Sequence, residues 1–481
     1  MKVSGDRLGF RLENSYATLP EILFTRQKPL PVSSPKVLIF NFDLARELGL
    51  SESLSQESDI LCGNVLIDGS EPIAQAYAGH QFGHFNILGD GRAILLGEQI
   101  SPDGRRWDIQ LKGSGRTPYS RDGDGRAALG PMLREYLISE AMYALGIPTT
   151  RSLAVLATGE KVFREKGLPG AILVRVASSH IRVGTFEYAA FRGGKALVKD
   201  LSDYTIRRHF PEIEQSNNKY LELLKVVISR QARLISQWMG VGFIHGVMNT
   251  DNMSVAGETI DYGPCAFMDY FKSTKVYSSI DRHGRYAFSN QPQIAHWNLA
   301  RFAETLIPFL SEKQNESIEL AQNALDDFSR IFLENWHSLM AAKIGLKSSE
   351  AAAQLLSELL QLMEKERADY TNTFNTLANG DSVWQQVQFK EWRERWKIQV
   401  ASAPGGMTEA SESMKKCNPV VIPRNHTVEE AINRAVEFED YGLFNDLLSA
   451  LRRPFADLEN SAKLKKPPEP HEEVRATFCG T

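Results

Sequence analysis

The chain has 481 residues, with 55 Lys and Arg against 59 Asp and Glu, and therefore a formal net charge of −4. This near-neutral balance excludes a protein that holds nucleic acid through a broadly basic surface. Hydrophobic residues make up 42% and charged residues 24%, which is typical of a folded protein and not of a disordered one. No run of 18 apolar residues occurs, so no membrane span is expected. The charge balance likewise gives no reason to expect a nucleic-acid partner.

The cysteine content and the N-terminal sequence both bear on the compartment. The chain has 4 cysteines and no C-x-x-C pair, and such sparse usage fits a reducing environment. No apolar segment of a secretory signal follows Met1. We therefore expect a cytoplasmic protein.

The first part of the chain is rich in strand signals. An apolar-periodic stretch at 42–50 predicts a helix that ends at Gly49, and Pro131 opens a longer helix that ends near Gly146. Short apolar or alternating runs predict strands at 38–40, 93–96, 107–111, 152–157 and 171–177.

The character of the sequence changes after about residue 200, where helical periodicity dominates. Helices are expected at 220–239, 296–310, 316–343, 349–378, 384–399 and 427–452. Residues 402–423 contain Pro, Gly and Ser and predict a linker or exposed loop. Three prolines among charges predict a disordered tail from Ala462.

Glycines are concentrated between residues 79 and 130, which contain eleven of the 35 in the chain. Within this stretch Gly89-Asp90-Gly91-Arg92 lies just before a predicted strand. A turn of this kind can offer backbone N–H groups to phosphate oxygens. A tight β-turn without a ligand explains a lone pair of glycines of this kind more often than a phosphate site does.

A lysine and a glutamate follow at spacings that protein kinases use. Lys112 ends the strand predicted at 107–111, and Glu135 lies in the next predicted helix. Kinases pair such a strand lysine, which contacts ATP phosphates, with a helix glutamate. The alternative is that Lys112 ends an exposed strand and Glu135 faces solvent.

The third feature is a loop that begins at His245. Kinases have H-R-D-x-x-x-x-N and then D-F-G. Here Asn252 falls at the asparagine position, and Asp261 begins Asp-Tyr-Gly. Asn and Asp oxygens suit Mg²⁺, which keeps phosphates as further ligands.

The same loop departs from kinases at the catalytic base. Val247 occupies that position and cannot accept a proton, which puts ordinary phosphoryl transfer in doubt. Asp251 is a candidate displaced base; it could equally orient the loop or bind a second metal ion.

These features occur in the chain order of a kinase and predict an α+β fold of two lobes. We expect a strand-rich N-lobe with its N-terminal extension at 1–185 and a helical C-lobe at 186–400. A C-terminal extension of helices and a flexible tail with Cys479 is expected at 401–481.

Longer segments extend the likeness from kinases in general to one family. The chain resembles the selenoprotein O family of kinase-fold pseudokinases, in its bacterial form with cysteine near the C-terminus. The segments that carry the resemblance are Gly79–His84, Leu88–Arg92, Gln110–Ser120, Arg121–Gly130, Val174–His180, His245–Asn252 and Asp261–Pro264. The resemblance extends over most of the chain from about residue 10 to 310 and, more loosely, over the remainder.

The resemblance implies a protein adenylyltransferase, which moves AMP from ATP to Ser, Thr or Tyr hydroxyls of proteins, with ATP flipped relative to kinases. It assigns Lys112, Arg175 and Arg182 to the buried phosphates and Glu135 to the support of Lys112. Asp251 matches the proton acceptor, and Asn252 and Asp261 match the ligands of Mg²⁺ or Mn²⁺. Further nucleotide contacts are implied for Gly89, Gly91, Arg92, Asp124, Gly125 and Asp261.

Three other activities stay open at this point. UMP transfer with Mn²⁺ is one, a true kinase is the second, and a catalytically inactive nucleotide-binding pseudokinase is the third. The intact set of Lys112, Glu135, Asn252 and Asp261 argues against an inactive protein.

Cys479 has two interpretations. It is either an ordinary tail residue or one partner of a reversible disulfide that ties the tail near the active site. Cys265 is the candidate partner, because it lies four residues after Asp261.

Overall fold

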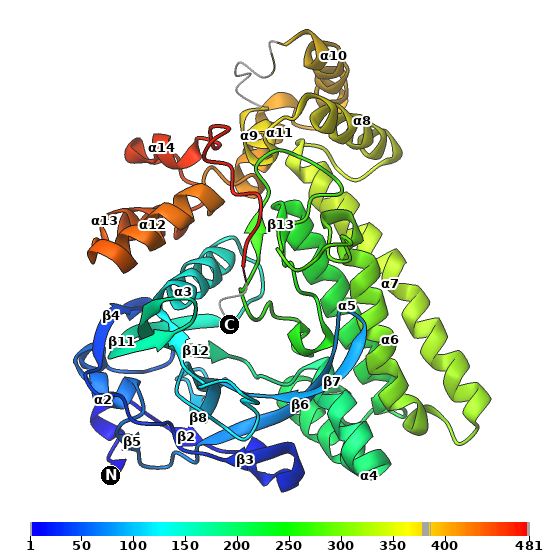
Figure 1. Cartoon of the computed structure of the whole chain (residues 1–481). Helices are drawn as coiled ribbons and strands as arrows, with labels where there is room; N and C mark the ends of the chain where they lie inside the picture. The colour runs from blue at the N-terminus through cyan, green and yellow to red at the C-terminus, as the bar shows by residue number, and fades with distance from the viewer. Residues whose placement is uncertain (1, 378–383, 385, 479–481) are drawn as a thin grey trace.

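The computed structural model of the chain describes residues 2–377, 384 and 386–478 (Figure 1). Its centre is a 10-stranded sheet with the strand order β3-β6-β8-β9-β12-β11-β4, and every pairing in it is antiparallel. These strands span Phe24–Arg26, Ile73–Gln81, Ala93–Ile100, Arg106–Lys112, Gly167–Ala177, Arg151–Phe163 and Lys36–Phe40. The strands predicted at the five apolar runs are confirmed.

Shorter strands complete the sheet and add two small ones. β2 (Leu12–Glu13), β7 (His84–Gly89) and β10 (Ala127–Ala128) pair with β8, β6 and β12. Separate two-stranded sheets join β1 (Lys2–Val3) to β5 (Leu66–Ile67), and β13 (Phe243–Ile244) to β14 (Ala266–Phe267).

The register of the central strands decides which polar side chains share a face. Gln110 is opposite Arg175, and Lys112 is opposite Leu173 two residues along. Because side chains of a strand alternate between faces, Gln110, Lys112 and Arg175 project to the same side of the sheet. Helix α3 (Leu129–Ala144), which contains the buried Glu135, packs against β11 and β12.

Helices form most of the chain after β12. They are α4 (Val183–His209), α5 (Lys219–Gly240), α6 (Gln291–Leu310), α7 (Gln314–Lys343), α8 (Glu350–Glu366), α9 (Tyr370–Thr376), α10 (Val387–Ser402), α11 (Gly406–Cys417), α12 (Asn425–Phe438), α13 (Gly442–Leu451) and α14 (Ala462–Lys465). Two short helices, α1 (Phe42–Glu47) and α2 (Ser58–Leu61), lie in the strand-rich part.

Two predicted helices are each divided by a residue with left-handed backbone. Arg367 (φ 52°) ends α8, and Asp369 caps the following α9 through its side chain. Glu439 (φ 52°) ends α12 before α13 begins. Periodicity alone does not reveal such breaks, because the apolar pattern continues on both sides of them.

The linker predicted at 402–423 is wrong over most of its length, because α11 occupies its middle. Ala410 and Met414, one helical turn apart, are buried, and α11 packs against α7 and α10. The Pro and Gly residues at 404–406 precede the helix or begin it.

The prediction of a disordered tail is also wrong for the part described. The segment after α14 runs back toward the middle of the molecule (Figure 1). The backbone N–H of Thr477 donates to Tyr277 at 2.7 Å, and its hydroxyl donates to the carbonyl of Pro264. Prolines prevent a helix here but not an extended segment that bonds to a neighbouring loop.

A buried arginine fixes the loop that follows Asp261. Arg424, at the start of α12, is 1% exposed and lies 2.7 Å from Asp269 and 2.8 Å from Asp369. The C-terminal helices are thereby joined to the segment after β14.

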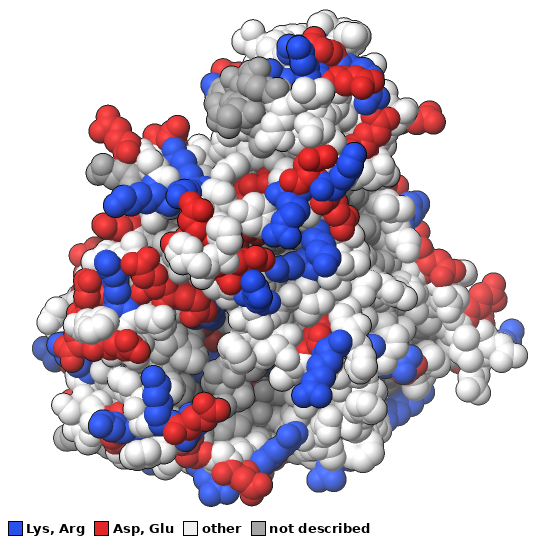
Figure 2. Space-filling view, turned by 45° about the horizontal axis from the view of Figure 1, so that its top comes forward, with Lys and Arg blue, Asp and Glu red and all other residues white. Residues whose placement is uncertain are grey.

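The surface agrees with the near-neutral composition. Figure 2 shows Lys and Arg interspersed with Asp and Glu over the face it presents. Among the described residues, no helix combines the length and apolar character needed to span a bilayer.

Candidate active site

The structure brings Lys112 and Glu135 together. The ammonium of Lys112, at the end of β9, lies 2.6 Å from the carboxylate of Glu135 on α3. The two side chains are only 8% and 4% exposed. The solvent-facing alternative for these residues is therefore wrong.

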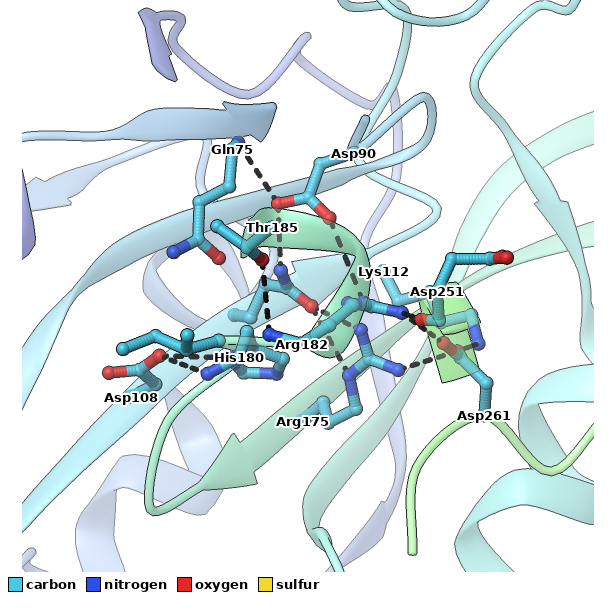
Figure 3. Close-up of polar contacts among 12 residues, drawn as sticks. Gln75, Asp90, Asp108, Lys112, Arg175, His180, Arg182, Thr185, Asp251 and Asp261 are labelled. Atoms are coloured by element: carbon cyan, nitrogen blue, oxygen red, sulfur yellow. Dashed lines mark hydrogen bonds and ion pairs between the residues drawn. The ribbon is translucent and has the colours of Figure 1, made fainter. Parts of the chain in front are cut away.

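Three cations converge on the carboxylate of Asp261 (Figure 3). Lys112 approaches to 2.6 Å, Arg175 to 2.7 Å and Arg182 to 2.9 Å. Burial alone would raise the pKa of Asp261, but these cations outweigh it and hold the pKa well below its ordinary range. The φ of Asp261 is 64°, a left-handed conformation that Asp and Asn tolerate better than most residues.

Arg182 ties this cluster to the loop that carries Asp251. It caps the start of α4, donates to the backbone carbonyl of Asp251 at 2.6 Å and stacks 4.5 Å from the ring centre of Tyr77. Sequence reasoning overlooked Asp90, whose carboxylate is 4.0 Å from Arg182. Burial raises the pKa of Asp90 to about 6.

The Gly89–Arg92 turn is packed differently from expectation. The N–H of Asp90 donates to Gln75 and that of Gly91 to Gly89, so neither is directed at a ligand. A Cβ on Gly91 would lie 2.9 Å from the carbonyl of Tyr119, which shows how closely the next loop covers the turn. The carbonyl of Arg92 accepts from Gly113 at 2.6 Å and so joins the turn to the end of β9.

Asp124 and Gly125 lie away from the three cations in this structure. Asp124 pairs with Arg164 at 3.0 Å, and Gly125 accepts from the N–H of Gly115 at 3.0 Å. Both residues belong to the loop between β9 and β10, and no contact joins Asp124 to Lys112 or Arg182 among the described residues.

The loop from His245 to Asn252 is buried and held by its own hydrogen bonds. His245 contacts the carbonyl of Ile260 at 3.0 Å, and the side-chain N–H of Asn252 donates to Val247 at 2.9 Å. That bond fixes the amide nitrogen of Asn252 and leaves its oxygen for another partner. Val247 is buried, as expected of an apolar residue.

Asp251 is buried with one carboxylate oxygen that has no hydrogen-bond partner in the described structure. Burial raises the pKa of Asp251 to about 7. An unpartnered buried carboxylate is costly, and such groups are concentrated at functional sites.

The β6–β7 hairpin, with the Gly79–His84 sequence, lies directly on the Asp251 loop. A Cβ on Gly79 would be only 2.1 Å from the free oxygen of Asp251, so only glycine fits there. The N–H of His80 donates to Thr250 at 2.7 Å and that of Phe82 to Asn249 at 3.2 Å. The cluster of glycines was the only sequence signal for this contact.

Hard oxygen donors are available for a metal ion, but few come from the protein. Among the described residues, no three His, Cys, Asp or Glu side chains gather as a complete metal site. Asp261 contributes a carboxylate and Asn252 an amide oxygen, so water or phosphate oxygens must supply the other ligands. Mg²⁺ binds in this way, and the residues therefore fit such an ion.

Comparison with known proteins decides the family. The sequence profile described as "Protein adenylyltransferase SelO" matches residues 7–452. The chain belongs to this family. Relatives named protein nucleotidyltransferase YdiU are 56% identical in Bacillus cereus (strain B4264), 55% in Shouchella clausii and 54% in Geobacillus kaustophilus. Each alignment covers 98% of this chain and 99% of the relative.

The SelO family match includes every residue of the Asp261 cluster and the Asp251 loop. Membership confirms the resemblance seen in the sequence and makes the chain an enzyme of the nucleotidyltransferase class. Cys479 lies outside the described residues, so its disulfide stays a prediction. Cys265 is buried, and the hydroxyl of Thr477 contacts the carbonyl of its neighbour Pro264.

Proposed function

We propose that the chain transfers AMP from ATP to Ser, Thr or Tyr hydroxyls of proteins and releases pyrophosphate. Its family supports this reaction. The observation that carries the proposal is the convergence of Lys112, Arg175 and Arg182, each at most 8% exposed, on one carboxylate. Three buried cations gathered at one point suit a highly charged phosphate chain.

We further propose a kinase-like division of labour within a two-lobed fold. Residues 1–185 supply the phosphate cations, residues 186–400 supply the Asp251 loop and Asp261, and residues 401–481 form an extension. In this arrangement Lys112, Arg175 and Arg182 hold the β- and γ-phosphates, for which arginine is suited by its bidentate fork. The α-phosphate then faces the acceptor hydroxyl, and pyrophosphate leaves.

Asp261 and Asn252 would hold Mg²⁺ or Mn²⁺, which neutralises phosphate charge when it is bound. Because Asp261 contacts three cations in this structure, those cations must shift their contacts toward phosphate when the ion takes its place. Asp251 accepts the proton of the acceptor hydroxyl. Val247 argues against an ordinary kinase, since no base stands at its position.

The experiment that tests the proposal follows the label from ATP. The protein is incubated with a mixture of candidate protein acceptors and ATP labelled at either the α- or the γ-phosphate, with Mg²⁺ or Mn²⁺. We expect label on protein from the α position only. Label from the γ position alone would establish a kinase, and binding of ATP without any labelling would establish an inactive module. Labelled UTP with Mn²⁺ tests UMP transfer.

Asp251→Asn tests the role of Asp251 as a base without changing the residues that bind ATP. The substitution keeps the size of the side chain and removes its ability to accept a proton, so transfer should fall at least 100-fold while ATP affinity stays within about threefold. Unchanged transfer in this variant would reject the role of Asp251.

A further inference from the structure

A basic cavity of about 820 Å³ lies apart from the Asp261 cluster. Its walls come from the start of β9, the segment after β12, the C-terminal end of α4, α5 and the loop at 256–258. One carboxylate, Glu258, is among the lining residues. The arginines among them are Arg105, Arg106, Arg207, Arg208, Arg230 and Arg233.

Three of the arginines are already neutralised. Arg105 pairs with Asp103 at 2.6 Å, Arg106 with Glu98 at 3.3 Å and Arg208 with Asp108 at 2.7 Å. These ion pairs hold the wall of the cavity together and explain why the arginines are there without any ligand.

The other three arginines have no such explanation. In the part of the chain that the structure describes, no carboxylate lies within ion-pairing distance of Arg207, Arg230 or Arg233. Arg230 is half-buried; it donates to the carbonyl of Ala256 at 3.0 Å and lies 4.5 Å from the ring centre of Phe210. Burial lowers the pKa of Arg230, because its charge is only partly compensated.

One unpartnered polar atom and apolar side chains belong to residues that line the same space. The amide oxygen of Gln237 is buried and has no hydrogen-bond partner among the described residues. Trp107 and Leu234 supply apolar surface. Small-molecule sites combine such a volume with an apolar wall and a few unsatisfied polar groups.

We propose that this cavity binds a phosphorylated small molecule of about nucleotide size. Its phosphates contact Arg207, Arg230 and Arg233, since guanidinium groups pair with phosphate oxygens in a bidentate manner. Its remaining part lies against Trp107 and Leu234. The site does not depend on AMP transfer, because it shares no residue with the Asp261 cluster.

Calorimetric titration of the full chain tests the site with pyrophosphate and with ADP, both without metal. Pyrophosphate reports on the phosphate contacts alone, and tighter binding of ADP would show that the rest of the cavity takes part. The test variant is R207E/R233E, which reverses two exposed charges on α4 and α5. R192E/K225E is the matched control, since it makes the same change on exposed positions of the same helices outside the cavity.

Lys112→Met removes one cation of the Asp261 cluster and so distinguishes pyrophosphate binding in the cavity from binding at that cluster. Arg182→Met serves the same purpose if the first variant does not fold. We expect pyrophosphate binding in both the control and this variant. In R207E/R233E, combined with either active-site change, binding should weaken at least tenfold. Equal binding in R207E/R233E and R192E/K225E when both carry the same active-site change, or no binding once the Asp261 cluster alone is altered, would overturn the proposal.

Discussion

Replacing Asp261 by Asn or Ala tests both the ion pairs of this carboxylate and the left-handed backbone conformation of the residue. Lys112, Arg175 and Arg182 all lie within 2.9 Å of this carboxylate. Removing one partner of a buried ion pair costs about 3 to 5 kcal/mol of folding free energy. Lys112 and Arg175 keep Glu135, and the Asp261 side chain is 23% exposed, so we expect about 3 kcal/mol for Asp261→Asn.

The alanine variant should lose about 1 kcal/mol more, because φ is 64° and a left-handed backbone penalises alanine more than asparagine. Urea unfolding without nucleotide measures both losses. Transfer of α-phosphate label should fall at least 1,000-fold in both, a loss of about 4 kcal/mol in transition-state stabilisation. If Asp261→Asn were as stable as the wild type, the cations would not depend on this carboxylate. If the two variants were equally stable, the backbone argument would be wrong.

Three further changes address other parts of the molecule. Gly79→Ala should reduce transfer about 100-fold, because the added Cβ displaces Asp251. Gly167→Ala is the control and should not reduce transfer, since its Cβ would meet nothing closer than 3.4 Å. Equal activity of the two variants would contradict the contact between Gly79 and Asp251. Burial raises the pKa of Glu258 to about 7, so the wild type loses stability as pH rises from the ordinary value of about 4.3 through 7. Glu258→Gln should therefore be about 3 kcal/mol more stable than the wild type at pH 8 and equal to it at pH 4. A pH-independent difference in thermal unfolding would refute this. Arg424→Met leaves two buried carboxylates unpaired and should lower the free energy of unfolding, measured in urea, by about 3 to 5 kcal/mol. A loss below about 1 kcal/mol would show that the ion pairs are dispensable.

The sequence pattern put Lys112 at the end of a strand and Glu135 in the next helix, but it left a solvent-facing alternative open for both. Their pairing was implied by the family resemblance, and the structure confirms it. The positions of Asn252 and Asp261 followed from the spacing of one loop. Positions of this kind can be predicted from the sequence because each depends on neighbours that are close along the chain.

Contacts between distant segments could not be predicted in the same way. The spacing of Arg175 and Arg182 decides nothing, because the chain turns at 178–180, and only the folded protein brings both to Asp261. Likewise, nothing in the Gly79–His84 sequence indicates which loop it covers. Helix α11 escaped prediction because Pro and Gly at 404–406 dominate the local composition, while the burial of Ala410 and Met414 depends on α7.

The connections of the segment after Asp261 bear on when the enzyme becomes active during its synthesis. Asp269 receives its arginine from a residue 155 positions later, and Pro264 receives the Thr477 hydroxyl from 213 positions later. Translation proceeds at about 5 to 20 residues per second, so these partners reach the loop about 8 to 40 seconds after it leaves the ribosome. A nascent chain that already contains Asp251 and Asp261 therefore lacks part of their support, and we expect ribosome-bound intermediates to be inactive toward their neighbours.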